Sequence, residues 1–328
     1  MGQNIDRTRA RQTGRGREVS WPHHIPPRGW WDIVGRVFSE VMEDRITLIA
    51  AGATFYLILA LFPALTAFVS LYGLVADPVT IADHIAFLGS LMPKAGYDMI
   101  SGQLHALAKA NTNALSFGFL FGVLAALWSA NNGIKTIFEA MNIAYEEKEK
   151  RSFIWLNVMS LLFTLGAMVI AALFVISVGV VPAVLSFLRL DSFAAILIEY
   201  LRWPVIIVAA AFAISIIYRY GPSRRRAKWR WQVPGAAIAT IVWLIASIGF
   251  SWYLTNFANY NATYGSLGAV IGFLMWVWIS MVILLVGAEI NAEMEHQTAI
   301  DSTIGRDRPM GGRGAHVADT LGAASNED

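Results

Sequence analysis

Residues 231–288 read WQVPGAAIATIVWLIASIGFSWYLTNFANYNATYGSLGAVIGFLMWVWISMVILLVGA and contain no Asp, Glu, Lys or Arg. A transmembrane helix needs about 20 mostly apolar residues to cross a hydrocarbon core about 30 Å thick, so this run is long enough for two crossings. Its middle, residues 256–266, is rich in Asn, Tyr, Thr and Gly, which favour a turn. The run therefore predicts two spans, at about 233–256 and 266–288.

Composition extends this pattern to most of the chain. Hydrophobic residues make up 56% of the 328 residues and charged residues only 15%, which lies outside the range of ordinary soluble domains. We expect an all-α, polytopic integral membrane protein, with about six transmembrane helices in a membrane domain at 47–290. Charge-free runs predict the other four spans at about 47–75, 113–132, 153–178 and 203–218.

The segments outside the spans have patterns of their own. At 30–46, apolar residues recur at helical spacing with charged residues between them, which predicts an amphipathic interfacial helix. Residues 1–29 are rich in Arg and Gly and predict a disordered basic cytoplasmic tail, and 291–328 predict a mostly disordered C-terminal tail. Residues 76–112 keep a helical period among polar neighbours, so we expect short helices there on the outer face.

The distribution of Lys and Arg sets the expected orientation, because cytoplasmic loops carry an excess of these residues. Six spans put Lys94, Lys109, Arg189 and Arg202 on one side of the membrane, which leaves 21 of the 25 Lys and Arg on the other. We therefore expect a multi-pass protein of a bacterial inner, or cytoplasmic, membrane with both termini in the cytoplasm.

Patterns that would indicate an enzyme are missing from the sequence. The chain has no cysteine, and its six histidines show no His-x-x-x-His pair or other metal-ligand spacing. No Gly-x-Ser-x-Gly turn occurs, although separated Ser, His and Asp residues could still form a triad in space. We expect no catalytic residue, no metal and no cofactor.

Polar residues near the ends of the apolar runs are candidates for a polar cavity or gate, because an unsatisfied polar group in hydrocarbon costs several kcal/mol. The alternative is structural: amides cap helix ends and hydrogen-bond neighbouring helices. Glu289, at the end of a long apolar helix, could titrate or pair with Lys135, or serve as an interfacial anchor. The candidates are Asn131, Asn132, Lys135, Asn157, Asn256, Asn261, Tyr264 and Glu289.

Three glycines, Gly265, Gly268 and Gly272, fall three and four residues apart at the start of the last predicted span. This spacing puts them on one helix surface and predicts tight helix packing. The alternative is that they leave space for a substrate or allow a bend.

A basic cluster joins the fourth and fifth predicted spans. Interleaved cations and aromatic rings can bind single-stranded RNA, but a juxtamembrane loop needs the same residues to sit against anionic lipid headgroups. We expect lipid headgroups at the cytoplasmic face and no nucleic acid as partners. The cluster consists of Arg224, Arg225, Arg226, Lys228 and Arg230.

Six stretches together form a recognisable pattern: Ala50-Ala-Gly-Ala-Thr-Phe-Tyr-Leu57, Leu61-Phe-Pro-Ala64, Trp128-Ser-Ala-Asn-Asn-Gly-Ile-Lys135, Asn142-Ile-Ala-Tyr145, Tyr260-Asn-Ala-Thr-Tyr-Gly-Ser-Leu-Gly-Ala-Val-Ile-Gly272 and Gly287-Ala-Glu-Ile-Asn-Ala-Glu293. In these stretches the sequence resembles the YihY/BrkB family of inner-membrane proteins, once labelled ribonuclease BN. The resemblance implies a six-span inner-membrane protein, and some relatives are linked to envelope lipid handling and others to serum resistance.

Three functional hypotheses follow from these features. The first is a transporter or flippase-like protein for a lipid or other envelope amphiphile, driven by a gradient or a partner because no Gly-x-x-x-x-Gly-Lys-Ser/Thr motif appears. The second is a non-catalytic membrane scaffold for envelope assembly, with an envelope protein as partner. The third is a membrane-associated ribonuclease. The sequence leaves the substrate, the direction of movement and the oligomeric state open.

Overall fold

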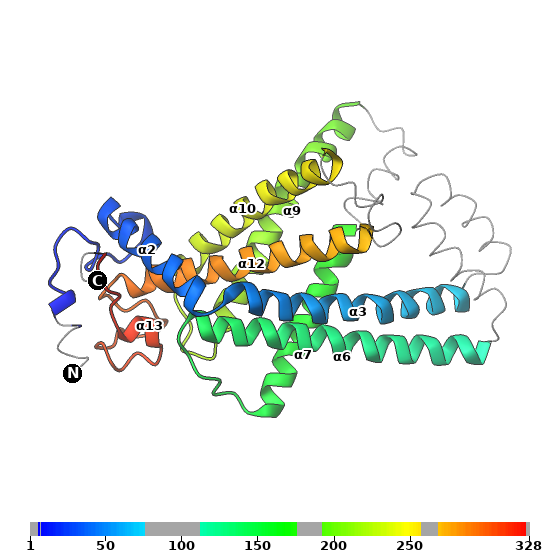
Figure 1. Cartoon of the computed structure of the whole chain (residues 1–328), viewed down its shortest axis with the longest axis horizontal. Coiled ribbons are helices and arrows are strands. Elements are labelled where there is room, and N and C mark those ends of the chain that lie inside the picture. Colours follow the sequence, from blue (N-terminus) through cyan, green and yellow to red (C-terminus); the bar gives the residue numbers. More distant parts are fainter. Residues whose placement is uncertain (1–5, 7, 76–111, 176–191, 257–267, 326–328) are drawn as a thin grey trace.

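A computed structural model describes residues 6, 8–75, 112–175, 192–256 and 268–325 (Figure 1). These residues form helices and no β-strand, apart from one isolated antiparallel bridge between Ala227 and Thr303, which confirms the predicted all-α class. The helices are η1 (Pro22–His24), α2 (Pro27–Glu43), α3 (Ile46–Val75), α6 (Thr112–Ala144), α7 (Phe153–Val175), α9 (Ser192–Tyr220), α10 (Trp229–Asn256), α12 (Gly268–His296) and α13 (His316–Asp319).

Five of these helices are long and apolar enough to cross a membrane, judged by length and composition: α6, α7, α9, α10 and α12. A sixth, α3, is 30 residues long, and its part Ile46–Ala60 is apolar as well. A polytopic architecture is thereby confirmed. The short outer-face helices predicted at 76–112 lie outside the described residues.

The helices extend past the predicted spans. α6 continues to Ala144 rather than ending near 132, and α12 continues to His296 rather than 288. The length of a charge-free run reflects the thickness of the hydrocarbon core. A helix can continue beyond that core for as long as its backbone hydrogen bonds continue. The extra turns carry polar side chains beyond the apolar layer.

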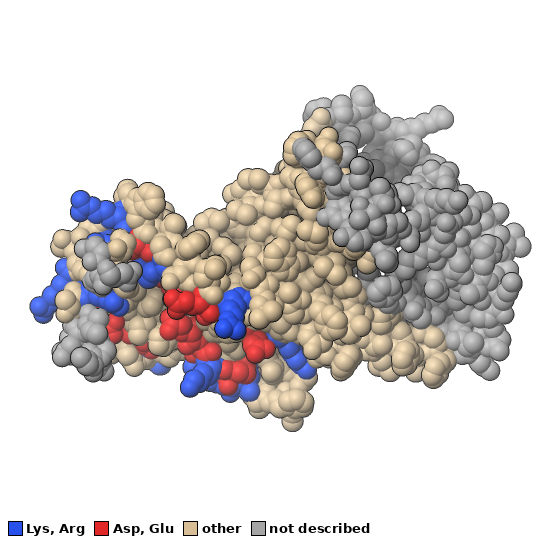
Figure 2. All heavy atoms as spheres, in the orientation of Figure 1, with Lys and Arg blue, Asp and Glu red and all other residues tan. Residues whose placement is uncertain are grey.

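The helices pack around one converging end. α3 packs along most of α6, α10 contacts both α9 and α12, and α2 crosses the end of α12 (Figure 1). The buried core lies at this end and includes Phe138, Met141, Tyr145, Tyr218 and Leu285. Lys, Arg, Asp and Glu gather at the same end, over α2, the connecting loops and the C-terminal segment (Figure 2).

Elsewhere the spanning helices expose apolar side chains. Only 11% of the Phe153–Ile170 window is buried, and 28% of Val270–His296. Large side chains such as Phe117, Val208 and Ile248 are more than half exposed. Apolar surface on this scale needs lipid as its solvent.

Indole N–H groups within the apolar helices find partners on neighbouring helices. Trp243 Nε1 donates to Ser280 Oγ at 2.9 Å, and Trp276 Nε1 donates to Ser247 Oγ at 3.1 Å, so the two bonds tie α10 to α12 in both directions. Because the hydrocarbon core contains no water, these N–H groups need hydrogen-bond acceptors within the protein.

A second pair of glycines, outside the predicted set, marks a close approach of α10 and α12. Gly265 lies outside the described residues, and a Cβ on Gly272 would meet Leu254 at an ordinary 3.7 Å. By contrast, a Cβ on Gly287 of α12 would lie 2.8 Å from the Ala239 Cβ of α10. A Cβ on Gly235 would lie 2.5 Å from the Gly287 carbonyl oxygen, so this second glycine pair sets the α10–α12 crossing.

The described residues of the two terminal segments, where the sequence predicts disorder, pack together in the structure. Residues 8–25 and 297–325 pack on each other and on α2, and the Arg17 side chain is almost fully buried. Arg9 Nη1 donates to the Leu321 carbonyl at 2.7 Å, Arg17 Nη2 to Gly322 at 2.8 Å and Arg36 Nη1 to Ala323 at 2.7 Å. Composition favours disorder because each tail alone has few apolar residues. It does not reveal that Arg side chains near the N-terminus donate to backbone carbonyl groups of the C-terminal segment.

Candidate functional site

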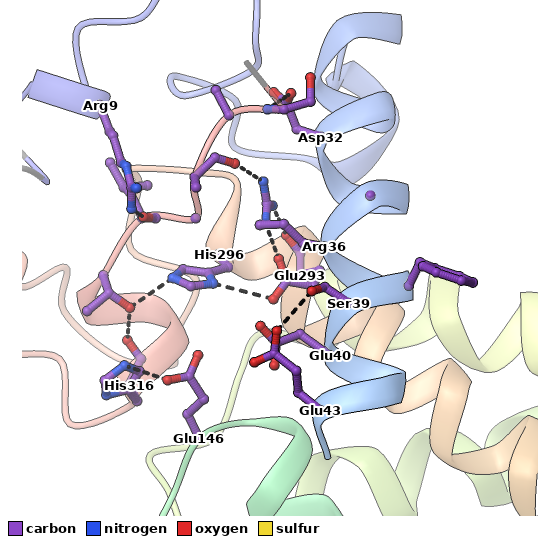
Figure 3. Close-up of a pocket in the computed structure, with 18 of the residues that line it drawn as sticks. Arg9, Asp32, Arg36, Ser39, Glu40, Glu43, Glu146, Glu293, His296 and His316 are labelled. Carbon is purple, nitrogen blue, oxygen red and sulfur yellow. Dashed lines mark hydrogen bonds and ion pairs between the residues drawn. The ribbon is translucent and has the colours of Figure 1, made fainter. Parts of the chain in front are cut away.

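An acidic cluster lies where α2 meets the end of α12. Its carboxyl groups come from α2 and the residue after it, from α12, and from the second residue after the end of α6, and Figure 3 shows several of them facing the same space. Like charges gathered in a partly buried place raise the free energy of the ionised state. The cluster consists of Glu40, Glu43 and Asp44 at the end of α2, Glu146 after α6, and Glu289 and Glu293 on α12.

Glu289 is buried within the acidic cluster and has no cationic partner among the described residues. Its side chain is 1% exposed, and its Oε1 has no hydrogen-bond partner among the described residues. Its carboxyl group lies beside the carboxyl group of Asp44. A proton on one of two such neighbouring carboxyl groups can form a hydrogen bond to the other. The Glu289–Asp44 pair is therefore a candidate site for one proton.

Asp44 lies just after α2, outside the spanning helices. Burial raises the pKa of its carboxyl group, the hydrogen bond from Glu289 lowers it in part, and the charges of Glu146 and Glu43 raise it further. The two carboxyl groups of the pair thus compete for one proton in a place that disfavours two negative charges.

Glu293, one helical turn beyond Glu289, has a cationic partner. It forms an ion pair with the Arg36 Nε of α2, and His296 Nδ1 lies 3.5 Å from its Oε1. Arg36 also donates to Gln297 Oε1 at 2.7 Å. On the same face of α12, one carboxyl group is therefore paired with a cation, whereas the other lies beside a second carboxyl group.

A cavity of about 880 Å³ opens beside the acidic cluster, between α2, the end of α12 and residues 320–325. Glu40, Glu43 and Glu293 line one wall, as Figure 3 shows. Phe38 and Met42 line its edge and are 74% and 67% exposed. The cavity therefore joins a charged wall to an apolar rim on the exposed stripe of α2.

Glu40 makes this wall sensitive to pH near neutrality. Burial, followed by the negative charges of Glu293 and Asp44, raises the pKa of the Glu40 carboxyl from 4.5 to about 7. An ordinary glutamate is fully ionised at that pH.

A Glu40→Gln variant is expected to be more stable than the parent at pH 8 but not at pH 4.5. The folded parent keeps a proton that the unfolded chain loses between pH 4.5 and about 7, so its free energy of unfolding falls as pH rises through this window. Solvent screening of this partly exposed group limits the effect to about 1 kcal/mol, or about 2–4 °C in Tm. Thermal unfolding in detergent from pH 4.5 to 8 measures it. Glu18→Gln, which removes an exposed carboxyl outside the cavity, is the control, and a gain that does not change with pH would contradict the assignment.

The candidate residues from the sequence do not gather in this cavity. Asn157 Nδ2 donates to the Phe153 carbonyl at 2.7 Å, and Asn256 Nδ2 to Trp252 at 2.8 Å, so both bond to their own helices. Asn131 is half-buried with no partner for its Oδ1 among the described residues. The Asn132 carbonyl, not its amide, accepts a bond from Thr136. Asn261 and Tyr264 lie outside the described residues.

Glu289 is the one of these candidates that joins the acidic cluster, but with a different partner from the one considered. Lys135 of α6 is half-buried and forms no ion pair in the part of the chain that the structure describes. The neighbour of Glu289 is instead Asp44, which the sequence analysis placed in the interfacial helix.

Asn291 has a role that the sequence analysis missed. Its Oδ1 accepts from the Gly235 N–H at 2.9 Å, and its Nδ2 donates to the Gln232 carbonyl at 2.9 Å. These bonds bracket Pro234 in the first turns of α10, where proline has no N–H of its own. The stretch Gly287–Glu293, quoted above for the family resemblance, carried this signal: its polar residues alternate along the end of an apolar helix.

Several members of the basic cluster have partners within the protein. Arg224 is buried, pairs with Glu295 at 2.5 Å and lies over the Tyr145 ring at 4.3 Å. Lys228 Nζ donates to the Asp301 carbonyl at 2.8 Å, and Arg230 lies over the Trp21 ring at 4.9 Å. The C-terminal segment and the N-terminal tail therefore contact part of the cluster, and the predicted contact with lipid headgroups stays a prediction.

Long apolar helices with lipid-facing side chains, and charges gathered at one described end, define a multi-pass α-helical membrane protein. Within this class, residues 37–310 match the family model described as Virulence factor BrkB. The chain belongs to this family, which confirms the resemblance drawn from its motifs.

Individual relatives agree with this assignment. The chain is similar to a protein of Bacillus subtilis named putative ribonuclease-like protein YfkH, with 32% identity over 249 residues, which cover 74% of this chain and 88% of that protein. It is similar to a UPF0761 membrane protein of Vibrio vulnificus, with 26% identity and coverage of 82% and 85%. A UPF0761 membrane protein of Nitrosospira multiformis is 28% identical, over 80% of this chain and 61% of that protein. No solved structure matches the chain.

Among the described residues, no group of three or more His, Asp or Glu has the arrangement of a metal site. The nearest approach is the acidic cluster itself, where the carboxyl groups are spread along α2 and α12. What this arrangement can do chemically is hold and release protons.

Proposed function

We propose that the protein is a transporter or flippase-like protein for a lipid or other envelope amphiphile, and that the Glu289–Asp44 pair couples it to protons. The observation that carries the proposal is the buried carboxyl group of Glu289, which follows the charge-free run of α12 and has no hydrogen-bond partner for its Oε1 among the described residues. Without a motif for ATP binding, a proton gradient is the available energy source. The proposed setting is the inner membrane, with both termini in the cytoplasm.

Loss of the shared proton supplies a driving force for movement. An ionised Glu289 would face the charges of Asp44, Glu40 and Glu293 in a buried place. Repulsion between them acts across the contact between α2 and α12, because Asp44 and Glu40 belong to the α2 side. Deprotonation thus favours separation of these two helices, and protonation favours the closed arrangement.

The cavity fits an amphiphilic substrate. Its wall carries carboxyl groups and the side chains of Arg36 and His296, and its rim carries Phe38 and Met42. A polar headgroup suits the wall, while an acyl chain suits the exposed apolar stripe of α2, formed by Trp31, Val34, Phe38 and Met42.

A Glu289→Gln variant is expected to reach the membrane in normal amounts but to lose proton-dependent transport. The amide can still hydrogen-bond Asp44, but it does not titrate in this range. The measurement is movement of fluorescent lipid between leaflets in liposomes that contain the purified protein, with and without a pH gradient. The parent should respond to the gradient and the variant should not.

Glu18→Gln serves as the control, because Glu18 is exposed and belongs neither to the cavity lining nor to the acidic cluster. A variant that keeps the full gradient response would refute the role of Glu289. If the parent moves no lipid and instead copurifies with an envelope protein, the scaffold function replaces transport. Cleavage of RNA by parent free of contaminating nucleases would favour the activity named in YfkH.

A further inference from the structure

A second cavity, of about 330 Å³, lies between the start of α7, the end of α9 and the loop at 221–228. Basic side chains dominate its wall, and no Asp or Glu lines it. The basic lining residues are Lys150, Arg151, Arg219, Arg224, Arg225 and Arg226. This cavity is separate from the acidic one, and nothing in the proposed transport uses it.

Half of these cations already have carboxylate partners. Lys150 pairs with Glu147 at 2.6 Å, Arg151 with Glu149 at 2.7 Å and Arg224 with Glu295 at 2.5 Å. Arg219, Arg225 and Arg226 pair with no carboxylate in the described ranges. The wall of the cavity therefore carries excess positive charge.

Unpartnered nitrogens at the cavity point to a ligand with acceptor oxygens. Arg219 Nε, Arg224 Nη1 and Arg225 Nη1 are buried and have no hydrogen-bond partner among the described residues. Buried donors normally have partners, so three such atoms from one cavity lining are exceptional. Guanidinium groups bind phosphate oxygens in particular, through short charge-assisted hydrogen bonds.

The same guanidinium groups are held in fixed positions. Arg219 donates to the Ala227 carbonyl and lies over the Trp229 ring at 4.5 Å. Arg225 donates to the Ile304 carbonyl, and its backbone N–H donates to Gly314 at 3.0 Å. Because the C-terminal segment positions Arg225, a ligand here meets a pre-formed site rather than a mobile loop.

The surroundings of the cavity point to the bilayer as the source of the ligand. Trp155 and Met159, from the first turns of α7, line it beside the cations. Trp155 is 53% exposed, and the neighbouring Phe153 and Ile154 are 80% and 75% exposed. Trp beside cations at the end of an apolar helix is typical of the headgroup layer.

We propose that this cavity binds the phosphodiester headgroup of an anionic phospholipid from the leaflet that contacts the 221–228 loop. The free nitrogens of Arg219 and Arg225 contact the phosphate oxygens, and Arg226 contributes charge at the opening. The acyl chains lie along the exposed start of α7. The site holds a resident lipid and does not depend on the transport function.

The test compares phosphatidylglycerol, phosphatidylcholine and inorganic phosphate added to the purified full-length protein in a mild detergent, with Tm and native mass spectrometry as readouts. Phosphatidylglycerol is expected to raise the Tm and to remain bound, whereas the other two should do neither. In an Arg219→Gln/Arg225→Gln variant, the apparent Kd for phosphatidylglycerol should rise at least about tenfold, because two charge-assisted bonds are lost.

Arg306→Gln is the matched control, since Arg306 is exposed on the C-terminal segment and lies outside the cavity. Arg226→Gln, at an exposed lining position, is a milder variant in case the double variant fails to fold. It should also weaken phosphatidylglycerol binding, whereas Arg306→Gln should not. Equal phosphatidylglycerol binding by the parent and these variants would overturn the proposal. An equal effect of inorganic phosphate would overturn the lipid as its source.

Discussion

A Gly287→Val variant is expected to disappear almost completely from the membrane fraction. The first atom added at this position would lie 2.8 Å from the Ala239 Cβ and against the hydroxyl of Tyr218. That hydroxyl is held by a 2.7 Å hydrogen bond to the Leu284 carbonyl, so it cannot move aside without leaving α12. The helices α10 and α12 must then separate, which breaks both bonds from Asn291 to α10. Overpacking plus the lost bonds should cost about 4 kcal/mol.

Quantitative immunoblots of membranes, with Tm for any protein recovered, measure this effect. Gly249→Val is the control, because Gly249 lies in α10 with open space around its Cβ position. It should leave abundance close to that of the parent. Similar losses in the two variants would show that the crossing at Gly287 and Gly235 is not the close contact described above.

The second large effect is expected at the buried ion pair between Arg224 and Glu295, whose side chains are 1% and 0% exposed. Arg224→Met should lower the free energy of unfolding by about 3–5 kcal/mol, because it leaves a buried carboxylate without its cation. An added Glu295→Gln should recover much of the loss, since the amide carries no charge, its oxygen can accept from Gln232, and its N–H2 can donate to the Ser302 hydroxyl.

Thermal and denaturant unfolding in detergent should separate these variants from a surface control. Asp307→Asn breaks the exposed pair with Lys228, where Asp307 is 74% exposed, and should cost less than 1 kcal/mol. If the double variant is as unstable as Arg224→Met alone, the loss arises from packing of the Arg224 stem on Tyr145 rather than from unpaired charge.

The spanning helices could be predicted from the sequence because hydrocarbon imposes a local rule. Every residue in a span must be apolar or find a partner within the protein, so runs such as 231–288 leave little choice of structure. Helix ends follow no such rule. α6 and α12 extend beyond their apolar runs because polar side chains near the membrane surface do not interrupt a helix.

The candidate site could be predicted only in part, because its partners are distant in sequence. Glu289 stood out as a carboxyl at the end of an apolar helix, but its contact with Asp44 depends on how α2 crosses α12. The glycine crossing shows the same limit. Gly265, Gly268 and Gly272 have the spacing associated with packing, whereas Gly235 and Gly287 meet only in the folded bundle.

The contacts between the two terminal segments have a consequence for biosynthesis. Arg17 and Arg36 bind carbonyls of residues 322 and 323, which are translated after every spanning helix. Until then the polar face of α2, including Asp32 and its contact with the Ser325 N–H, lacks its final partners. This end of the protein therefore completes its contacts only after the spanning helices have been made, and a ribosome that stalls late in translation would leave α2 without these partners.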